Sequence, residues 1–381
     1  MVSAIDELRV HLKLVTAMFL GGADSRDSPP ELRASSVRGA LRFWWRAWRL
    51  AREPTLTADG LFEAESAVFG STKGASPFSV RFRGGPREPG SVDVPGGPRE
   101  LRYLFYGVTD REAWLPGGEM SLSLASRRLP ADRPPLSKDV LVSLWLLCNL
   151  GGLGARTRRG AGAIQAAQVD PPWPEDLPPL SSTAESPVDL ANKLGAALRQ
   201  LLQLTSGSPA PSLTVPSLHP GALDIYVVAP RQPWTAAKAL EDVGRKFMQF
   251  RHQYAVDHKN TDGPVVKNFA NTGSVPATVQ RAALGLPLPF FYRDTGSRVT
   301  VSGTVGDEDV ERSSSPLHFR VVPLANDTYT VVLLFFKTPL LPTGGQLLLK
   351  SGRQVGRANA PDQTIIDEYL AQDGLLKVNY E

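Results

Sequence analysis

Apolar and polar residues alternate at the beginning of the chain and then change to a helical spacing. The segment LRVHLKLVTAMF (residues 8–19) alternates at first, which is typical of a strand with one buried face. A polar GGADSRDSPPE break follows, and the next segment, VRGALRFWWRAWRLARE, starts after Ser35 or Ser36 as the N-cap. This pattern predicts a strand followed by an amphipathic helix.

The pattern continues to predict short elements up to residue 170. Residues 78–83 and 101–108 have the composition of strands, and SLSLAS (121–126) is a candidate extra strand. A helix is expected from Ser137 to Asn149, and residues 163–169 form a short closing strand. The resulting order, β-α-β-β-α-β over residues 1–170, predicts a ferredoxin-like (RRM-like) domain.

The rest of the chain repeats this order after a change in composition. Residues 171–220 are rich in proline and contain one predicted helix, PVDLANKLGAALRQLLQL, so we expect a linker there. Residues 221–381 then give a second β-α-β-β-α-β series with a long insertion at 255–315. The predicted fold class is α+β, with two ferredoxin-like domains in tandem and a glycine-rich loop in the first.

Composition and charge narrow the classes of function. The 381 residues are enough for two domains. A formal net charge of +4, carried largely by arginine, is consistent with a polyanionic partner. The single cysteine, Cys148, excludes an internal disulfide framework and a cysteine-based zinc site, and we expect no metal or other cofactor.

The distribution of charged and apolar residues also indicates where in the cell the protein is found. Charged residues are scattered through the first twenty positions, which excludes the apolar core of a signal peptide. No apolar run approaches the roughly 20 residues that a membrane helix needs. We therefore expect a cytoplasmic protein that does not bind a membrane.

The segment NLGGLGARTRRGAGAI (149–164) combines glycine with arginine. Gly152 and Gly154 give G-x-G, but Thr157 stands where a dinucleotide-binding loop needs its third glycine, and the loop leads from a helix to a strand, which is the reverse order. Two interpretations stay open. Backbone amides and guanidinium groups hold phosphates, or the loop is a helix C-cap followed by a solvated basic turn. The candidate residues here for binding nucleic-acid phosphates are Gly151, Gly152, Gly154, Arg156, Arg158, Arg159 and Gly160.

The predicted helix after Ser36 has two neighbouring arcs of side chains. The apolar arc consists of Val37, Leu41, Trp44 and Trp48, and the basic arc consists of Arg38, Arg42, Arg46 and Arg49. The simplest interpretation is a core helix with a solvated arginine face. Trp45 falls within the basic arc, where an indole is a candidate for base stacking or a partner contact. We add Arg38, Arg42 and Arg46 to the candidate nucleic-acid-binding residues.

Motifs for catalysis are missing from the sequence. None of the five histidines, His11, His219, His252, His258 and His318, forms a recognisable dyad with a nucleophile or a carboxylate. The spacing of six between His252 and His258 does not place both on one helix face for a metal ion. Asp24 is the loop carboxylate that merits a test, although a turn-forming role is favoured. We predict no catalytic residue.

The chain resembles the RAMP superfamily of CRISPR-associated proteins in several segments. These are FLGGAD (19–24), ELRASSVRGALRFWWRA (31–47), ESAVFGST (65–72), NLGGLGARTRRGAG (149–162) and ERSSSPLHFR (311–320). Within the superfamily, the similarity is greatest to the first RAMP subunit of the type III-B (Cmr) effector complex.

The resemblance implies two ferredoxin-like domains and a place in a multisubunit RNA-guided complex used in antiviral defence. Guide CRISPR RNA, target RNA and other RAMP subunits are the implied partners. The implied position is the end of the complex that holds the 3′ region of the guide RNA, without a catalytic role.

Two other functions stay open. One is a metal-independent RAMP endoribonuclease, with His252, His258 or Asp24 as the general base. The other is a purely structural capping subunit that contacts its neighbours through the tryptophan-rich helix.

Overall fold

The structure is a computed structural model that describes residues 5–21, 29–85, 89–92, 98–127, 136–181, 183–204, 214–257 and 262–381. The chain folds into two compact units. The first comprises Met1–Gly244, His318–Leu333 and Leu376–Glu381, and the second comprises Arg245–Leu317 and Leu334–Leu375. The described helices include none that is long and apolar enough to span a membrane.

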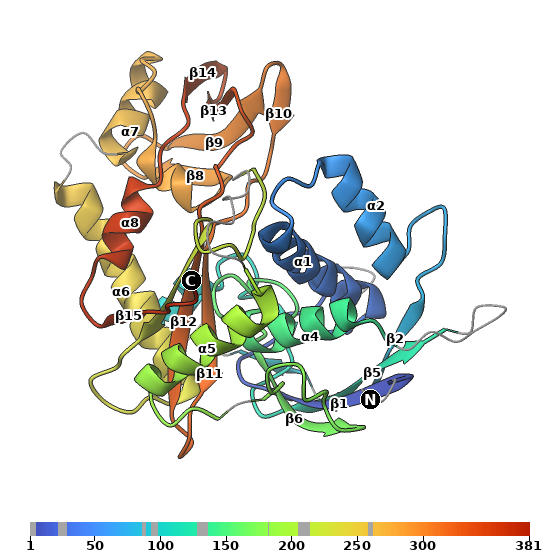
Figure 1. Cartoon of the computed structure of the whole chain (residues 1–381). Helices are drawn as coiled ribbons and strands as arrows, with labels where there is room; N and C mark the ends of the chain where they lie inside the picture. The colour runs from blue at the N-terminus through green and yellow to red at the C-terminus, as the bar shows by residue number, and fades with distance from the viewer. Residues whose placement is uncertain are drawn as a thin grey trace. The chain divides into compact units, whose positions relative to one another are not determined.

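The first sheet is antiparallel and has the strand order β2-β5-β1-β6. Its elements are β1 (Glu7–Leu14), α1 (Ala34–Arg52), β2 (Phe78–Gly84), β5 (Glu119–Ser126), α4 (Lys138–Leu150) and β6 (Ile164–Asp170). Figure 1 shows α1 and α4 on one side of this sheet. Buried and exposed residues alternate strictly along β1, so that Leu8, Val10 and Leu12 face the helices. The predicted β-α-β-β-α-β order is confirmed.

One predicted strand in this region is wrong. Residues 101–108 do not form a strand, since Arg99–Leu104 is the helix α3 and the third strand of the sheet is β5. The physical reason is the spacing of Leu101, Leu104, Phe105 and Val108, which is helical. Further elements are α2 (Ala58–Phe69) and the short strands β3 (Gly90–Ser91) and β4 (Glu112–Ala113), which pair with each other.

The second sheet has the strand order β11-β12-β7-β15. Its elements are β7 (Leu223–Val228), α6 (Ala236–Asp257), β11 (Leu317–Pro323), β12 (Tyr329–Phe336), α8 (Thr364–Leu370) and β15 (Leu375–Lys377). In both sheets the first strand of the series is central, between the third and the fourth, which is the ferredoxin-like arrangement. The predicted fold class is therefore confirmed, while the boundaries at 170 and 220 stay a prediction.

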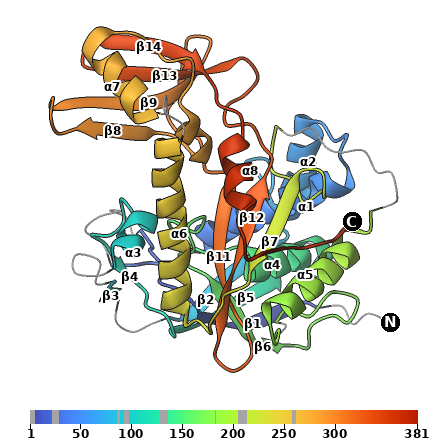
Figure 2. The same ribbon diagram turned by 90° about the vertical axis from the view of Figure 1, so that its left-hand side faces the viewer.

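The predicted insertion at 255–315 contributes to a sheet of its own in the second unit. The elements are α7 (Asp262–Thr272), the 3-10 helix η1 (Gln280–Leu284), β8 (Leu288–Tyr292), β9 (Ser297–Val305), β10 (Glu308–Val310), β13 (Gly345–Ser351) and β14 (Gln354–Asn359). The strand order is β10-β9-β13-β14, with β8 paired to β9. Figure 2 shows α7 against this sheet, where Phe269 and Val266 pack on Val299, Val301 and Leu347. The sequence pattern did not predict the β13–β14 hairpin.

The predicted helix of the linker is present as α5 (Pro187–Leu202). Ser186 caps it by accepting a hydrogen bond from the backbone N–H of Asp189. The indole N–H of Trp48 on α1 donates to the carbonyl oxygen of Leu201 at 2.9 Å. This segment is thus fixed to the tryptophan-rich helix rather than being only a spacer.

Candidate nucleic-acid interface

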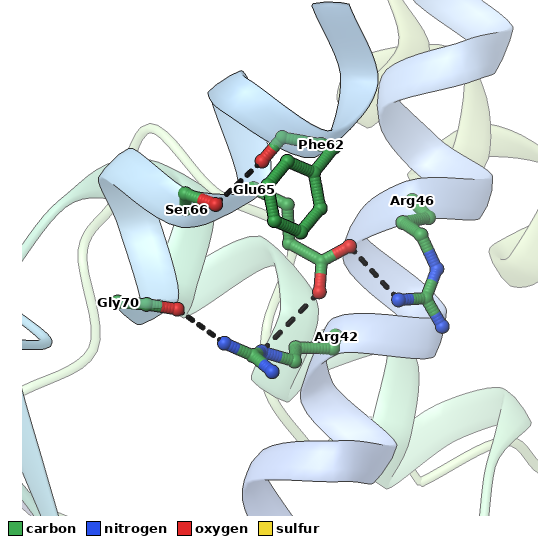
Figure 3. A network of polar contacts seen from close by, with 6 residues as sticks. All are labelled: Arg42, Arg46, Phe62, Glu65, Ser66 and Gly70. Atoms are coloured by element: carbon green, nitrogen blue, oxygen red, sulfur yellow. Dashed lines mark hydrogen bonds and ion pairs between the residues drawn. The ribbon is translucent and has the colours of Figure 1, made fainter. Parts of the chain in front are cut away.

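The arginines of α1 are held by neighbouring elements. A buried carboxylate, that of Glu65 on α2, lies 3.2 Å from Nε of Arg42 and 2.8 Å from a guanidinium nitrogen of Arg46. Figure 3 shows both arginines reaching across from α1 to this carboxylate, while Arg42 also donates to the carbonyl oxygen of Gly70. These ion pairs hold α2 against α1. They also neutralise part of the positive charge of Arg42 and Arg46, which were predicted to bind RNA.

Arg38 lies one turn earlier on the same helix. Its guanidinium donates to the carbonyl oxygen of Phe78 at 3.4 Å and lies 5.5 Å from the centroid of the Phe78 ring. Burial and the positive charges of Arg127 and Arg42 lower the pKa of Arg38. The arginine therefore sits in a locally positive environment beside β2.

The structure overturns the surface role predicted for Trp45. Its side chain is fully buried, its indole N–H donates to a carboxylate oxygen of Asp139 at 2.8 Å, and its ring meets that of Phe69 edge-on with centroids 6.0 Å apart. The helix has two buried faces, because α4 covers one arc and α2 covers the next. An exposed base-stacking or partner contact at Trp45 is therefore excluded.

The glycine-rich loop after α4 is tightly folded. Gly162 donates to the carbonyl oxygen of Ala17 at 2.7 Å, and its own carbonyl accepts from the N–H of Leu153 at 2.9 Å. At Gly162, φ is +65°, and an added Cβ would lie 1.8 Å from the Leu153 carbonyl oxygen. At Gly151 a Cβ would lie 2.3 Å from the indole nitrogen of Trp44. These glycines serve close packing, not only exposure of amides.

A buried arginine from the second sheet joins the two ends of this loop. Arg320 on β11 is almost fully buried and donates to the carbonyl oxygens of Gly151, Cys148 and Ile164, the last at 2.7 Å. Burial lowers its pKa to about 10, so the guanidinium stays charged at neutral pH. The cation lies at the carbonyl end of α4, where the helix dipole favours positive charge. Nothing local in the sequence marks this residue.

The three arginines of the loop have separate surroundings. Arg156 has a φ of +61° and donates to the carbonyl oxygen of Tyr106. Arg158 lies 5.8 Å from the centroid of the Phe43 ring, and burial lowers its pKa. Arg159 lies 5.3 Å from the centroid of the Phe319 ring. The loop therefore does not present one cluster of three parallel cations.

An open groove of about 430 Å³ lies between α1 and the glycine-rich loop. Gly151, Gly152, Gly154 and Arg158 line it, whereas the other predicted RNA-binding residues, Arg38, Arg42, Arg46, Arg156, Arg159 and Gly160, do not. Gly160 instead accepts a hydrogen bond from the hydroxyl of Thr16 through its carbonyl oxygen. The structure thus brings together part of the predicted site.

Sequence reasoning missed the other walls of the groove. Arg33, Phe43, Glu31 and His318 line it, and the Phe43 and His318 rings lie 6.2 Å apart at 34°. Arg33 and Phe43 lie within the segment 31–47, whose unusual density of arginine and aromatic residues was the available signal. His318 comes from β11, far away in sequence, and no local pattern connects it to α1.

The residues considered for catalysis do not converge. His11 is exposed on β1, His252 is exposed on α6, and the buried His219 accepts the N–H of Gly221 at 3.0 Å in a turn. Asp24 and His258 lie outside the described residues. Within the described part of the chain, no group of three or more His, Cys, Asp or Glu residues could hold a metal ion.

Comparison with known proteins places this site in a family. The family model of the RAMP superfamily matches residues 11–165, which include α1 and the glycine-rich loop. The CRISPR system Cmr subunit Cmr1-2 of Pyrococcus furiosus is 30% identical over 183 residues, which are 42% of this chain and 94% of the relative. The chain belongs to the Cmr1 family of RAMP proteins.

Two further members show how far the likeness extends. The Cmr1-1 subunit of the same organism is 31% identical over 157 residues, which are 39% of this chain and 44% of that relative. The crystal structure of Cmr1 from Pyrococcus furiosus in its apo form superposes with a TM-score of 0.60 at 20% identity, covering 98% of both chains. The Cmr1 fold therefore extends over the whole chain.

Proposed function

We propose that this chain is a non-catalytic RNA-binding subunit of a type III-B CRISPR ribonucleoprotein effector. In that complex it helps to hold the 3′ region of the guide RNA and to capture target RNA. Membership of the Cmr1 family supports the assembly, since the relatives are Cmr subunits. The groove beside the glycine-rich loop supports the RNA contact.

The groove combines the groups that a single RNA strand needs. Arg33 and Arg158 supply positive charge for phosphates. The N–H groups of Gly152 and Gly154 have no hydrogen-bond partner among the described residues, so they can donate to phosphate oxygens. Phe43 is partly exposed in the same wall, where a base can stack on it. This convergence is the observation that carries the proposal.

Binding of labelled single-stranded RNA to the full chain tests it. Replacing Arg33 and Arg158 by Gln removes two cations, so the slope of log K against log salt should fall by about 1.4. The control is Arg293→Gln with Arg353→Gln, two exposed arginines of the second unit. A second variant, Ala40→Glu, places a carboxylate in the groove without removing a loop arginine. An unchanged slope and affinity in both groove variants would overturn the RNA contact.

Incubation of the same labelled RNA with the protein distinguishes an RNA-binding subunit from a ribonuclease. His318 is the histidine that lines the groove, so a ribonuclease would use it as the general base. We expect the RNA to stay intact on a denaturing gel after long incubation. Cleavage that His318→Ala abolishes would show that the subunit is an endoribonuclease.

A further inference from the structure

Several basic side chains stand on the face of the first sheet that points away from α1 and α4. Along β1, Arg9, His11 and Lys13 are exposed, and on the edge strand β2 so are Arg81 and Arg83. No phenylalanine, tyrosine or tryptophan stands on this face within the described strands. Figure 1 shows the helices on the other side of the sheet, so this face is separate from the groove.

The strand register arranges these residues in rows. Ser123 on β5 stands between Arg81 and Arg9, and Ser121 stands between Arg83 and His11. Short hydroxyl side chains thus form a floor between the arginines of β2 on one side and Arg9 on the other, while Asp170 and Glu119 stand opposite Arg9 and Lys13 in the register. The rows repeat every two residues, which is about 7 Å along a strand and close to the separation of successive phosphates in a nucleic-acid strand.

A hollow of about 770 Å³ lies at one end of these rows and extends past the edge of the sheet to α1, which contributes Ala34 and Arg38 to its wall. Arg38, Arg81 and Arg127 line it, and the carboxylate in its wall, that of Glu7, lies 3.4 Å from the guanidinium of Arg9. The cations therefore outnumber the anions there. Burial lowers the pKa of Arg38 most, and the positive charges of Arg127 and Arg42 lower it further.

A polar atom in the floor also lacks a partner. The hydroxyl oxygen of Ser121 is buried and makes no hydrogen bond to any residue that the structure describes. Buried polar atoms are normally hydrogen-bonded, and an unpaired one calls for an explanation. An oxygen of a bound phosphate would accept a hydrogen bond from this hydroxyl.

We propose that this basic sheet face, defined by Arg9, Arg81, Arg83, Arg127, Ser121 and Ser123, is a second RNA-binding surface that holds the sugar–phosphate backbone of a single strand along β5. The inference rests on the proposed function. Phosphate contacts without aromatic stacking predict binding that does not depend on base sequence. An acidic protein partner is disfavoured, because the face lacks the apolar centre that protein interfaces have.

Charge removal on this face provides the first test. The full chain with Arg81→Gln and Arg83→Gln is compared with the control Arg293→Gln/Arg353→Gln, using the same labelled single-stranded RNA. The salt slope should fall by about 1.4, so that the defect in affinity shrinks about sevenfold between 50 and 200 mM salt. The slope of the control should not change.

Cysteine labelling locates the RNA directly. Cys148 is buried and burial raises its pKa to about 12, so it should give little background. Ala125→Cys introduces a thiol in the hollow, and Val355→Cys introduces one on an exposed strand of the second unit. Saturating RNA should slow maleimide labelling at position 125 at least fivefold and leave position 355 unchanged.

The outcomes separate this inference from the proposed function. Three results together would overturn the second surface and leave the groove proposal standing. The salt slope of RNA binding falls in the Arg33/Arg158 variant, it does not fall in the Arg81/Arg83 variant, and RNA does not slow maleimide labelling at position 125. Protection of position 125 by another protein subunit but not by RNA would show that the face is a protein interface. If the salt slope of RNA binding stays unchanged in both the Arg33/Arg158 variant and the Arg81/Arg83 variant, both proposals are overturned.

Discussion

Gly162→Ala is the sharpest perturbation of the glycine-rich loop. The residue has a φ of +65°, and a Cβ would lie 1.8 Å from the carbonyl oxygen of Leu153. The left-handed conformation costs about 1–2 kcal/mol once a Cβ is present. Relief of the clash must also weaken the two backbone hydrogen bonds of Gly162, to Ala17 and from Leu153, at about 1 kcal/mol each. We expect a total loss of about 3–4 kcal/mol.

Gly39→Ala is the matched control, since it makes the same substitution in the exposed interior of α1. A Cβ at Gly39 meets nothing within 4 Å, and alanine is favoured over glycine in a helix by about 1 kcal/mol. This variant should therefore be slightly more stable than the native chain.

Urea unfolding followed by tryptophan fluorescence measures how the two glycine substitutions change the stability of the first compact unit. All seven tryptophans precede Gly244, so the signal reports the first compact unit. The midpoint should fall clearly for Gly162→Ala and rise slightly for Gly39→Ala. Equal midpoints for the two variants would refute the argument that the loop needs glycine for packing.

Three other substitutions test the contacts around the site. Arg320→Met should accelerate hydrogen exchange of the loop amides more than tenfold while global stability changes less, because the cost of burying the cation is also removed; unchanged exchange contradicts this. Trp45→Phe should cost about 1–3 kcal/mol in urea unfolding through the unpaired Asp139 and leave the salt slope of RNA binding unaltered; a weaker slope contradicts this. Glu65→Gln should loosen α2 by about 1 kcal/mol, since both arginine partners are part-exposed, and expose it to proteolysis; an unchanged digestion pattern contradicts this.

Local periodicity was enough to predict the elements that have one buried face. The alternation in β1 and the apolar arc of α1 specify both elements and their orientation. Residues 101–108 were predicted as a strand from their composition, whereas the spacing of their apolar residues is helical and agrees with α3. In a segment of only eight residues, composition and spacing can indicate different elements.

The missed features depend on contacts distant in sequence. Trp45 is buried because α2 covers a second face of α1, and a helical wheel of α1 alone does not show this. The β13–β14 hairpin belongs to a larger sheet because β13 also pairs with β9, whose paired residues lie 40 (Val305 to Gly345) to 50 (Thr300 to Lys350) positions earlier. Arg320 and His318 reach the glycine-rich loop and the groove from β11, so only the folded chain shows their roles.

Cross-linking in the assembled effector tests the central claim most directly. The complex, loaded with guide RNA and target RNA carrying photoreactive nucleotides, is irradiated, and the linked peptides of this subunit are mapped. We expect links in the segments that line the groove, at Phe43 and within residues 150–158. Efficient links elsewhere on the subunit, with none in these two segments, would contradict it.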